Sequence, residues 1–131
     1  MQFKVCLPMK TDKQWMPIWQ LKAIDQQKSH VELRLDISRD LKYFEGHFPG
    51  FGVLPGVVQI HWAQCLSRQF FDLPKFGFAG LEHIKFQALV LPGTKIDLIL
   101  SWQPELHKLG FVFQDAAKVY SSGRLLWKSV S

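Results

Sequence analysis

Two histidines are the residues whose type and spacing best suit proton transfer. His47 lies in a segment rich in glycine and proline, and His61 follows fourteen positions later in an apolar stretch. Glycines beside a histidine allow the backbone to approach a ligand closely. If a helix follows His47, its first N–H groups and its dipole favour negative charge at that end. The pattern therefore indicates a site for general base chemistry beside a developing oxyanion.

The same residues also allow structural interpretations. A histidine on an apolar helix is typical of a hydrogen-bonded core residue, and glycine and proline around His47 are typical of turns. The pair lacks a third ligand at an obvious spacing, so we expect no metal and no organic cofactor. Cys6 and Cys65 are too few for a disulfide framework or a cysteine-ligated zinc site, and a reducing, cytoplasmic setting is expected.

A long uncharged segment must position these histidines. From Gly46 through Ser67 there is no Asp, Glu, Lys or Arg. Pro55 and Gly56 would break a membrane-spanning helix, so we expect no membrane insertion. Instead we predict a loop over 46–54 and a helix that starts at Pro55, in its first turn, and runs from Gly56 to about Phe71. This helix is apolar nearly all round, which is typical of a helix inside a protein.

Strand patterns flank the helix on both sides. Val31, Leu33, Leu35 and Ile37 alternate with polar residues, as in a strand with one buried face. We predict strands over 18–24, 29–37, 95–102, 109–120 and 125–130, with turns at 25–29, 91–94 and 121–123. The first two strands should form a hairpin. The expected fold class is α+β, with one antiparallel meander interrupted once by a buried central helix.

Length and charge limit the other classes of function. The chain has 131 residues, which predicts a single domain over 1–131, and its net charge is +5. The basic residues are scattered singly along the second half, so we do not expect nucleic acid binding. The charge leaves open an acidic protein partner or simply a solvated basic surface.

Residues 43–57, YFEGHFPGFGVLPGV, resemble the signature of the 3-hydroxyacyl-[acyl-carrier-protein] dehydratases of the hot-dog fold. Residues 79–86 and 90–94 resemble that family's next strand and turn, so the resemblance covers roughly 17–130. It implies an antiparallel sheet wrapped around one long helix. It also implies a lyase that dehydrates a 3-hydroxyacyl thioester to the trans-2-enoyl thioester, in fatty acid or aryl polyene biosynthesis.

The resemblance also implies roles for individual residues. His47 would be the catalytic base, the Val53 carbonyl would orient its ring, and the Gly56 N–H would bind the thioester oxygen. The family's acidic helix residue falls at His61, and Gly52 stands where proline is usual. The histidine at position 61 resembles the branch associated with aryl polyene pathways.

The replacement at position 61 leaves two hypotheses open. An imidazolium at His61 could protonate the leaving hydroxyl while His47 stays neutral, or His61 could hold a water that does so. Alternatively, His61 marks a degenerate, non-catalytic copy.

The expected substrate is an apolar or aryl acyl chain. Its tunnel would be lined by Phe48, Phe51, Val57, Trp62 and Phe86. The aromatic residues are also compatible with ordinary core filling.

By the same resemblance the partner is an acidic acyl carrier protein that delivers the chain on a phosphopantetheine arm. Arg68, Lys75 and Lys85 are the expected contacts. A homodimer is implied, in which His61 of one protomer completes the site around the partner's His47. The alternatives are a hot-dog thioesterase, disfavoured because no Asp or Glu lies between Gly46 and Phe71, and a non-catalytic acyl-binding subunit.

Overall fold

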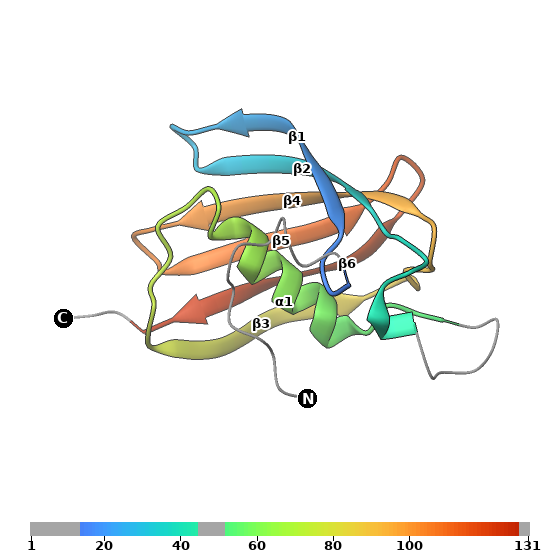
Figure 1. The fold of residues 1–131 in the computed structure, drawn as a ribbon. Helices are drawn as coiled ribbons and strands as arrows, with labels where there is room; N and C mark the ends of the chain where they lie inside the picture. The colour runs from blue at the N-terminus through green and yellow to red at the C-terminus, as the bar shows by residue number, and fades with distance from the viewer. Residues whose placement is uncertain (1–13, 45–51, 129–131) are drawn as a thin grey trace.

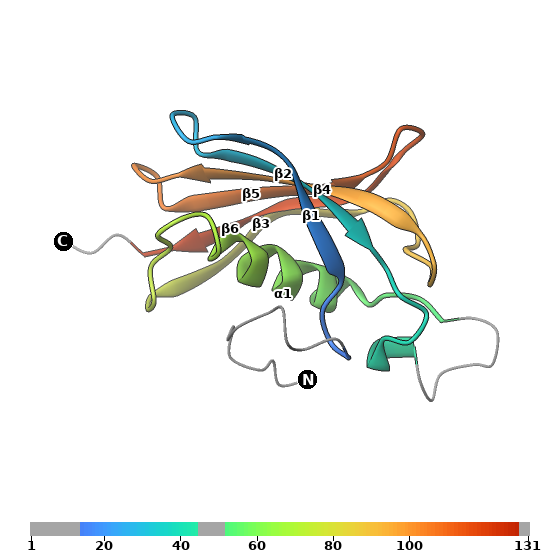
Figure 2. The same cartoon turned by 45° about the horizontal axis from the view of Figure 1, so that its top comes forward.

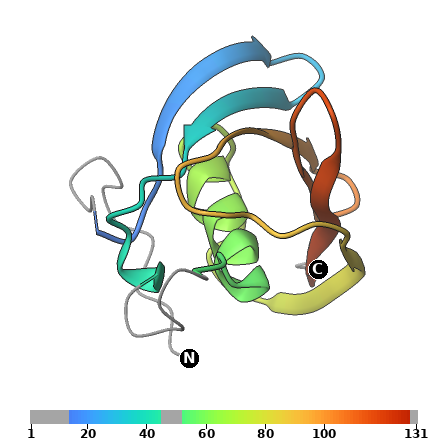
Figure 3. The same ribbon diagram turned by 90° about the vertical axis from the view of Figure 1, so that its right-hand side faces the viewer.

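The computed structural model describes residues 14–44 and 52–128. Six strands form one antiparallel sheet in the order β1-β2-β4-β5-β6-β3. The one α-helix of the described residues, α1, lies in the concave face of this sheet, which curls around it (Figures 1 and 3). Figure 2 shows the two layers, with the sheet above and the helix beneath it. The elements are β1 (Ile18–Asp25), β2 (His30–Asp36), a 3-10 turn (Lys42–Phe44), α1 (Gly56–Ser67), β3 (Phe78–Phe86), β4 (Lys95–Gln103), β5 (Lys108–Gln114) and β6 (Val119–Trp127).

The period-2 pattern correctly predicted the strands that form the centre of the core. In β2 the side chains of Val31, Leu33 and Leu35 are fully buried beneath the sheet. The alternating residues of β4 are buried in the same way (Ile96, Leu98, Leu100 and Trp102). The predicted β1–β2 hairpin is confirmed, with Ile18 paired to Asp36 and Asp25 paired to His30. The predicted turn at 91–94 is also present, and Gly93 takes the left-handed conformation with φ 83°.

The predicted meander is confirmed for the strands that it contained, since β1, β2, β4, β5 and β6 are successive neighbours in the sheet, but β3 lies outside it. β3 follows the helix in sequence but pairs with β6, at the opposite edge of the sheet from β1. β2 therefore pairs directly with β4, from Asp36 opposite Lys95 to His30 opposite Ser101. The helix and β3 together form the long connection that lets the chain cross to the far edge, and pairing of this kind leaves no local signal in the sequence.

The predicted turn at 121–123 is wrong, because these residues lie inside β6. The turn occurs earlier, where the Asp115 carboxylate accepts hydrogen bonds from the N–H groups of Ala117 and Lys118. Small residues are needed in β6 for packing. A Cβ on Gly123 would lie 2.2 Å from Cδ1 of Ile84, so the glycine makes room for a side chain from β3.

The helix is shorter than predicted but is buried as predicted. It ends at Ser67, and the next N–H groups of Gln69 and Phe70 donate to carbonyls only three residues back, which tightens the chain into turns. Pro55 is the N-cap, with φ −60° and ψ 147°, so it lies one residue before the first helical turn. Buried residues lie on several sides of the helix, as the near-absence of a polar face predicts.

Candidate functional site

The first turn of α1 presents backbone donors at the end predicted to bind an oxyanion. The N–H groups of Val58 and Gln59 both donate to the Pro55 carbonyl, at 3.1 and 3.2 Å. The N–H groups of Gly56 and Val57 donate to no carbonyl of a described residue. Donors at this position point out of the helix start, and the helix dipole adds positive potential there. The geometry therefore suits the predicted role of Gly56, which stays a prediction.

Phe86 covers this helix start. A Cβ on Gly56 would lie 2.5 Å from Cζ of Phe86, so the ring lies directly over the glycine. Phe86 is the last residue of β3, and about half of its side chain is exposed. Gly56, which is predicted to bind the thioester oxygen, and Phe86, which is predicted to line the acyl chain tunnel, are thus neighbours.

The peptide units just before the helix are held in fixed orientations. The Leu54 N–H donates to the Val90 carbonyl at 2.9 Å. In a trans peptide the carbonyl and the N–H point in opposite directions, so the Val53 carbonyl points away from Val90. Val53 therefore has a carbonyl oriented away from the sheet connection. His47, whose ring it is predicted to orient, lies outside the described residues.

A buried polar pair, missed in the sequence, lies beside these peptides. Gln59 is 3% exposed and Ser121 is fully buried. The Gln59 Nε2 donates to the Leu54 carbonyl at 3.2 Å, and its Oε1 accepts from the Ser121 hydroxyl at 2.6 Å. A glutamine within an otherwise apolar helix turn was the available signal. The burial of Ser121 was hidden because its neighbours in β6 have the composition of a turn.

His61 follows Gln59 by two residues on the helix and is 9% exposed. Its Nε2 lies 3.4 Å from Sγ of Cys65, the residue one turn later. Burial lowers the pKa of His61 below 6.5, because the charged imidazolium loses solvation. Burial therefore favours the neutral ring, and the roles predicted for His61 stay predictions.

The predicted tunnel residues fall into different environments. Trp62 is fully buried and its Nε1 donates to the Trp15 carbonyl at 2.9 Å. Its ring also meets Tyr43 edge to face, so Trp62 is held in the core. Val57 is 47% exposed on the first helical turn, close in sequence to the Gly56 donor. Phe48 and Phe51, like His47, lie outside the described residues.

The described residues that flank the His47 segment contact each other. A Cβ on Gly52 would lie 2.9 Å from Cδ1 of Phe44, so the Phe44 ring covers the glycine backbone. Phe44 ends the 3-10 turn, and Gly52 begins the run that leads into the helix. Glycine at position 52, where the resemblance places proline, thus gives the Phe44 ring its space.

The three basic residues predicted to meet a carrier protein differ in their surroundings. The Arg68 guanidinium donates to the carbonyls of Leu73 and Pro74 at 3.4 and 3.0 Å, so it braces its own loop. Lys75 and Lys85 are exposed and lie at opposite ends of β3. Lys85 precedes Phe86, so it is the one at the helix-start end.

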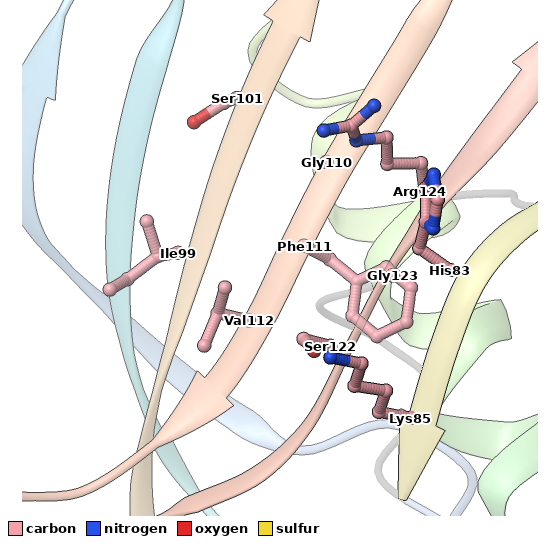
Figure 4. A pocket seen from close by; sticks show the side chains of 10 residues that line it. All are labelled: His83, Lys85, Ile99, Ser101, Gly110, Phe111, Val112, Ser122, Gly123 and Arg124. Carbon is pink, nitrogen blue, oxygen red and sulfur yellow. The ribbon is translucent and has the colours of Figure 1, made fainter.

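Lys85 also lines a groove on the outer face of the sheet, opposite the helix (Figure 4). This groove has a volume of about 430 Å³ and is formed over β3, β4, β5 and β6. Arg124, another lining residue, donates to the Glu82 carboxylate at 3.1 Å. Lys85 makes no ion pair with a described residue. The groove is separate from the helix start, where the predicted catalytic groups lie.

Within 14–44 and 52–128, no group of three or more His, Cys, Asp or Glu side chains is arranged to hold a metal ion. None of the helices in those ranges is long and apolar enough to cross a membrane.

Comparison with known proteins gives consistent matches. The family model described as ApeI dehydratase matches residues 23–124. A 3-hydroxyacyl-[acyl-carrier-protein] dehydratase FabZ of Pelotomaculum thermopropionicum is 33% identical over 93 residues, which are 66% of this chain and 63% of the relative. A FabZ of Lawsonia intracellularis is 34% identical over 61% of this chain and 57% of the relative. The chain thus spans about three fifths of the length of these curated relatives.

Solved structures match over a greater length. A chain of the dehydratase heterocomplex ApeI:P from Xenorhabdus doucetiae superposes with a TM-score of 0.73 at 29% identity, covering 86% of this chain and 98% of that one. An uncharacterized protein from Erwinia carotovora subsp. atroseptica gives a TM-score of 0.66 at 30% identity, covering 88% and 96%. The predicted α+β hot-dog fold is thereby confirmed. Since the family model matches more than half of the chain, this protein belongs to the ApeI-like dehydratase family.

Proposed function

We propose that this protein dehydrates a 3-hydroxyacyl thioester carried on acyl carrier protein to the trans-2-enoyl thioester, in fatty acid or aryl polyene biosynthesis. The observation that carries the proposal is the helix start. The backbone donors of Gly56 and Val57 are unpaired among described residues, and the family match extends across them. An oxyanion donor in a water-poor site contributes a few kcal/mol to such a reaction.

In the proposed reaction His47 removes the proton from C2. The electron pair forms the C2–C3 double bond, the C3–O bond breaks, and the Gly56 N–H stabilises the charge on the thioester oxygen. A water held by the buried His61 ring protonates the leaving hydroxyl. The proton on His47 then returns to that water, so the net products are the enoyl thioester and one water.

An edge strand supports the proposal of a homodimer. β3 forms one edge of the sheet, where the backbone groups on its outer side meet no partner strand among the described residues. Phe78, Leu81 and Phe86 on this strand are each about half exposed. A second copy that covers this edge would bury these side chains. The related heterocomplex in Xenorhabdus doucetiae makes a non-identical subunit the alternative occupant.

Product analysis tests the proposed activity. Carrier-bound 3-hydroxyacyl substrates of increasing conjugation are incubated with the full chain, and enoyl thioester and free thiol are both measured. Dehydration predicts enoyl thioester without thiol release, whereas free thiol would indicate a thioesterase. Sedimentation of the chain alone tests the dimer, and a monomer that becomes active only with a second subunit would overturn the homodimer.

The proposed setting is a cytoplasmic one without metal or organic cofactor. The charge of +5 suits docking of an acidic carrier protein. Dialysis against a chelator should leave turnover unchanged, and loss of turnover restored by a divalent cation would contradict this part of the proposal.

A further inference from the structure

We infer that Gln59 is a positioning residue that sets the orientation of the peptides around the helix start, with Ser121 as its anchor in the sheet. The inference rests on the proposed function for its catalytic consequence, but its geometry is independent of it. Gln59 lies on the first turn of α1 and reaches back toward the residues that precede the helix.

Gln59 holds two consecutive carbonyls. Its backbone N–H donates to Pro55 at 3.2 Å, and its side-chain Nε2 donates to Leu54 at 3.2 Å. The Val58 N–H also donates to the Pro55 carbonyl, at 3.1 Å, whereas the Leu54 carbonyl accepts from the Gln59 side chain. Gln59 therefore contacts the peptide planes on both sides of Pro55: it shares the second with Val58, and its side chain holds the first.

The peptide planes around Leu54 and Pro55 set the directions of the two backbone groups predicted to act in the reaction, the Gly56 N–H and the Val53 carbonyl. The Pro55 carbonyl and the Gly56 N–H belong to one trans peptide, so fixing the carbonyl fixes the direction of the N–H. On the other side, Leu54 is held by its carbonyl to Gln59 and by its N–H to Val90. The Leu54 N–H shares a peptide with the Val53 carbonyl, and this second peptide is fixed as well.

The Leu54 carbonyl determines which way the Gln59 amide faces, and the Ser121 hydroxyl satisfies the other end of the amide. The Leu54 carbonyl can only accept, so the NH₂ group of Gln59 must face it and Oε1 must face β6. The Ser121 hydroxyl supplies the donor that Oε1 requires, at 2.6 Å. Ser121 also pairs with Phe86 in the sheet, and Phe86 covers Gly56. The anchor is therefore part of the same packed unit as the helix start.

Because Gln59 and Ser121 are buried, both hydrogen bonds of the Gln59 amide must be kept. Both partners are shielded from water, and a buried amide with one unpaired end is costly, so removal of either partner disturbs the other. A site residue displaced by about 1 Å can lose on the order of 100-fold in rate. We expect Gln59→Met, which keeps the length of the side chain but not its amide, to lower kcat by about 10- to 100-fold with little change in KM.

The matched control is Ser67→Ala. Ser67 is fully buried like Ser121, and its hydroxyl donates to the Gln64 carbonyl at 2.7 Å, at the far end of the same helix. Ser121→Ala should lower kcat, whereas Ser67→Ala should lower only the unfolding temperature. Because Gln59 and Ser121 act through one amide, the double variant should lose little more activity than Gln59→Met alone.

Amide hydrogen exchange provides a readout that needs no turnover. The Leu54 N–H, protected by Val90, should exchange about tenfold or more faster in Gln59→Met and Ser121→Ala but not in Ser67→Ala. Unchanged exchange at Leu54, or equal kcat in Ser121→Ala and Ser67→Ala, would overturn the inference. If the unsubstituted chain dehydrates no substrate, the proposed function fails while the exchange measurement still decides the role of Gln59.

Discussion

The ring of Phe86 lies directly against the α-carbon of Gly56, because a Cβ at that glycine would come within 2.5 Å of the ring. The contact joins the end of β3 to the first residue of the helix. It places an apolar surface beside backbone donors, which is the combination that an acyl thioester requires.

Gly56→Ala tests this contact. The added methyl group must displace the half-exposed Phe86 ring, while the backbone N–H at position 56 remains. We expect about a 10-fold loss of kcat/KM and little loss of stability, since alanine is the better helix former. Adding Phe86→Ala should recover part of the activity in steady-state assays. A double variant less active than both single variants would show that the two residues do not act through this contact.

The pH dependence of stability tests the burial of His61. Burial lowers its pKa in the folded protein below the 6.5 of the unfolded chain, so the unfolded state binds more protons in that range. The contribution of His61 to the free energy of unfolding is therefore complete above about pH 6.5 and decreases as pH falls toward the folded pKa. Urea unfolding of the chain and of His61→Gln between pH 5 and 7 measures it. The variant should show the smaller pH dependence, and identical slopes would contradict a buried neutral ring.

Gly123→Ala tests the packing of Ile84 and Phe111 against Gly123, which could not be predicted from the sequence. Its Cβ would lie 2.2 Å from Ile84 and 3.1 Å from Phe111, so we expect a loss of about 1–3 kcal/mol in the free energy of unfolding. Gly110→Ala, on the adjacent strand, is the control, because its Cβ would meet only the Ser101 carbonyl at 3.8 Å. The control should be neutral or slightly stabilising in denaturant unfolding. Equal losses in the two variants would contradict the predicted crowding at Gly123.

Lys85→Glu tests where a carrier protein docks. Lys85 lies at the helix-start end of β3, whereas Lys75 precedes the other end. The charge reversal should raise KM for a carrier-bound substrate several-fold at low salt and leave a short pantetheine thioester unaffected. Lys75→Glu should have a smaller effect. An equal change with both substrates would show that Lys85 acts on the site and not on docking.

The residues that could be predicted from the sequence are those with a local pattern. Alternation in β2 and β4 identified the buried side chains, and the uncharged run containing Val58 and Leu66 identified the central helix. The position of β3 could not be predicted in this way, because its partner β6 lies some forty residues later. The turn was wrongly predicted at 121–123 because small residues are typical of turns. Here they are small for another reason, since the Ile84 side chain from β3 packs against Gly123.

In the candidate site, too, only the residues with a local sequence pattern could be predicted. The histidine and glycine motif indicated a helix start with free donors, and Gly56 has that environment. The Gln59–Ser121 pair could not be predicted, because the two residues lie far apart in the sequence and form a hydrogen bond only once the helix packs on the sheet. The low pKa of His61 likewise depends on burial that its neighbours in sequence do not specify.

The most direct test of the central claim is the mass of an intact carrier protein loaded with a 3-hydroxyacyl chain, followed over time with the enzyme and with His47→Ala. We predict that the unsubstituted enzyme removes one water from the chain. His47→Ala should be slower by about 10²- to 10⁴-fold, while His83→Asn, on the exposed side of β3, should keep full activity. Loss of water at the same rate in His47→Ala would contradict the proposal that this imidazole removes the proton.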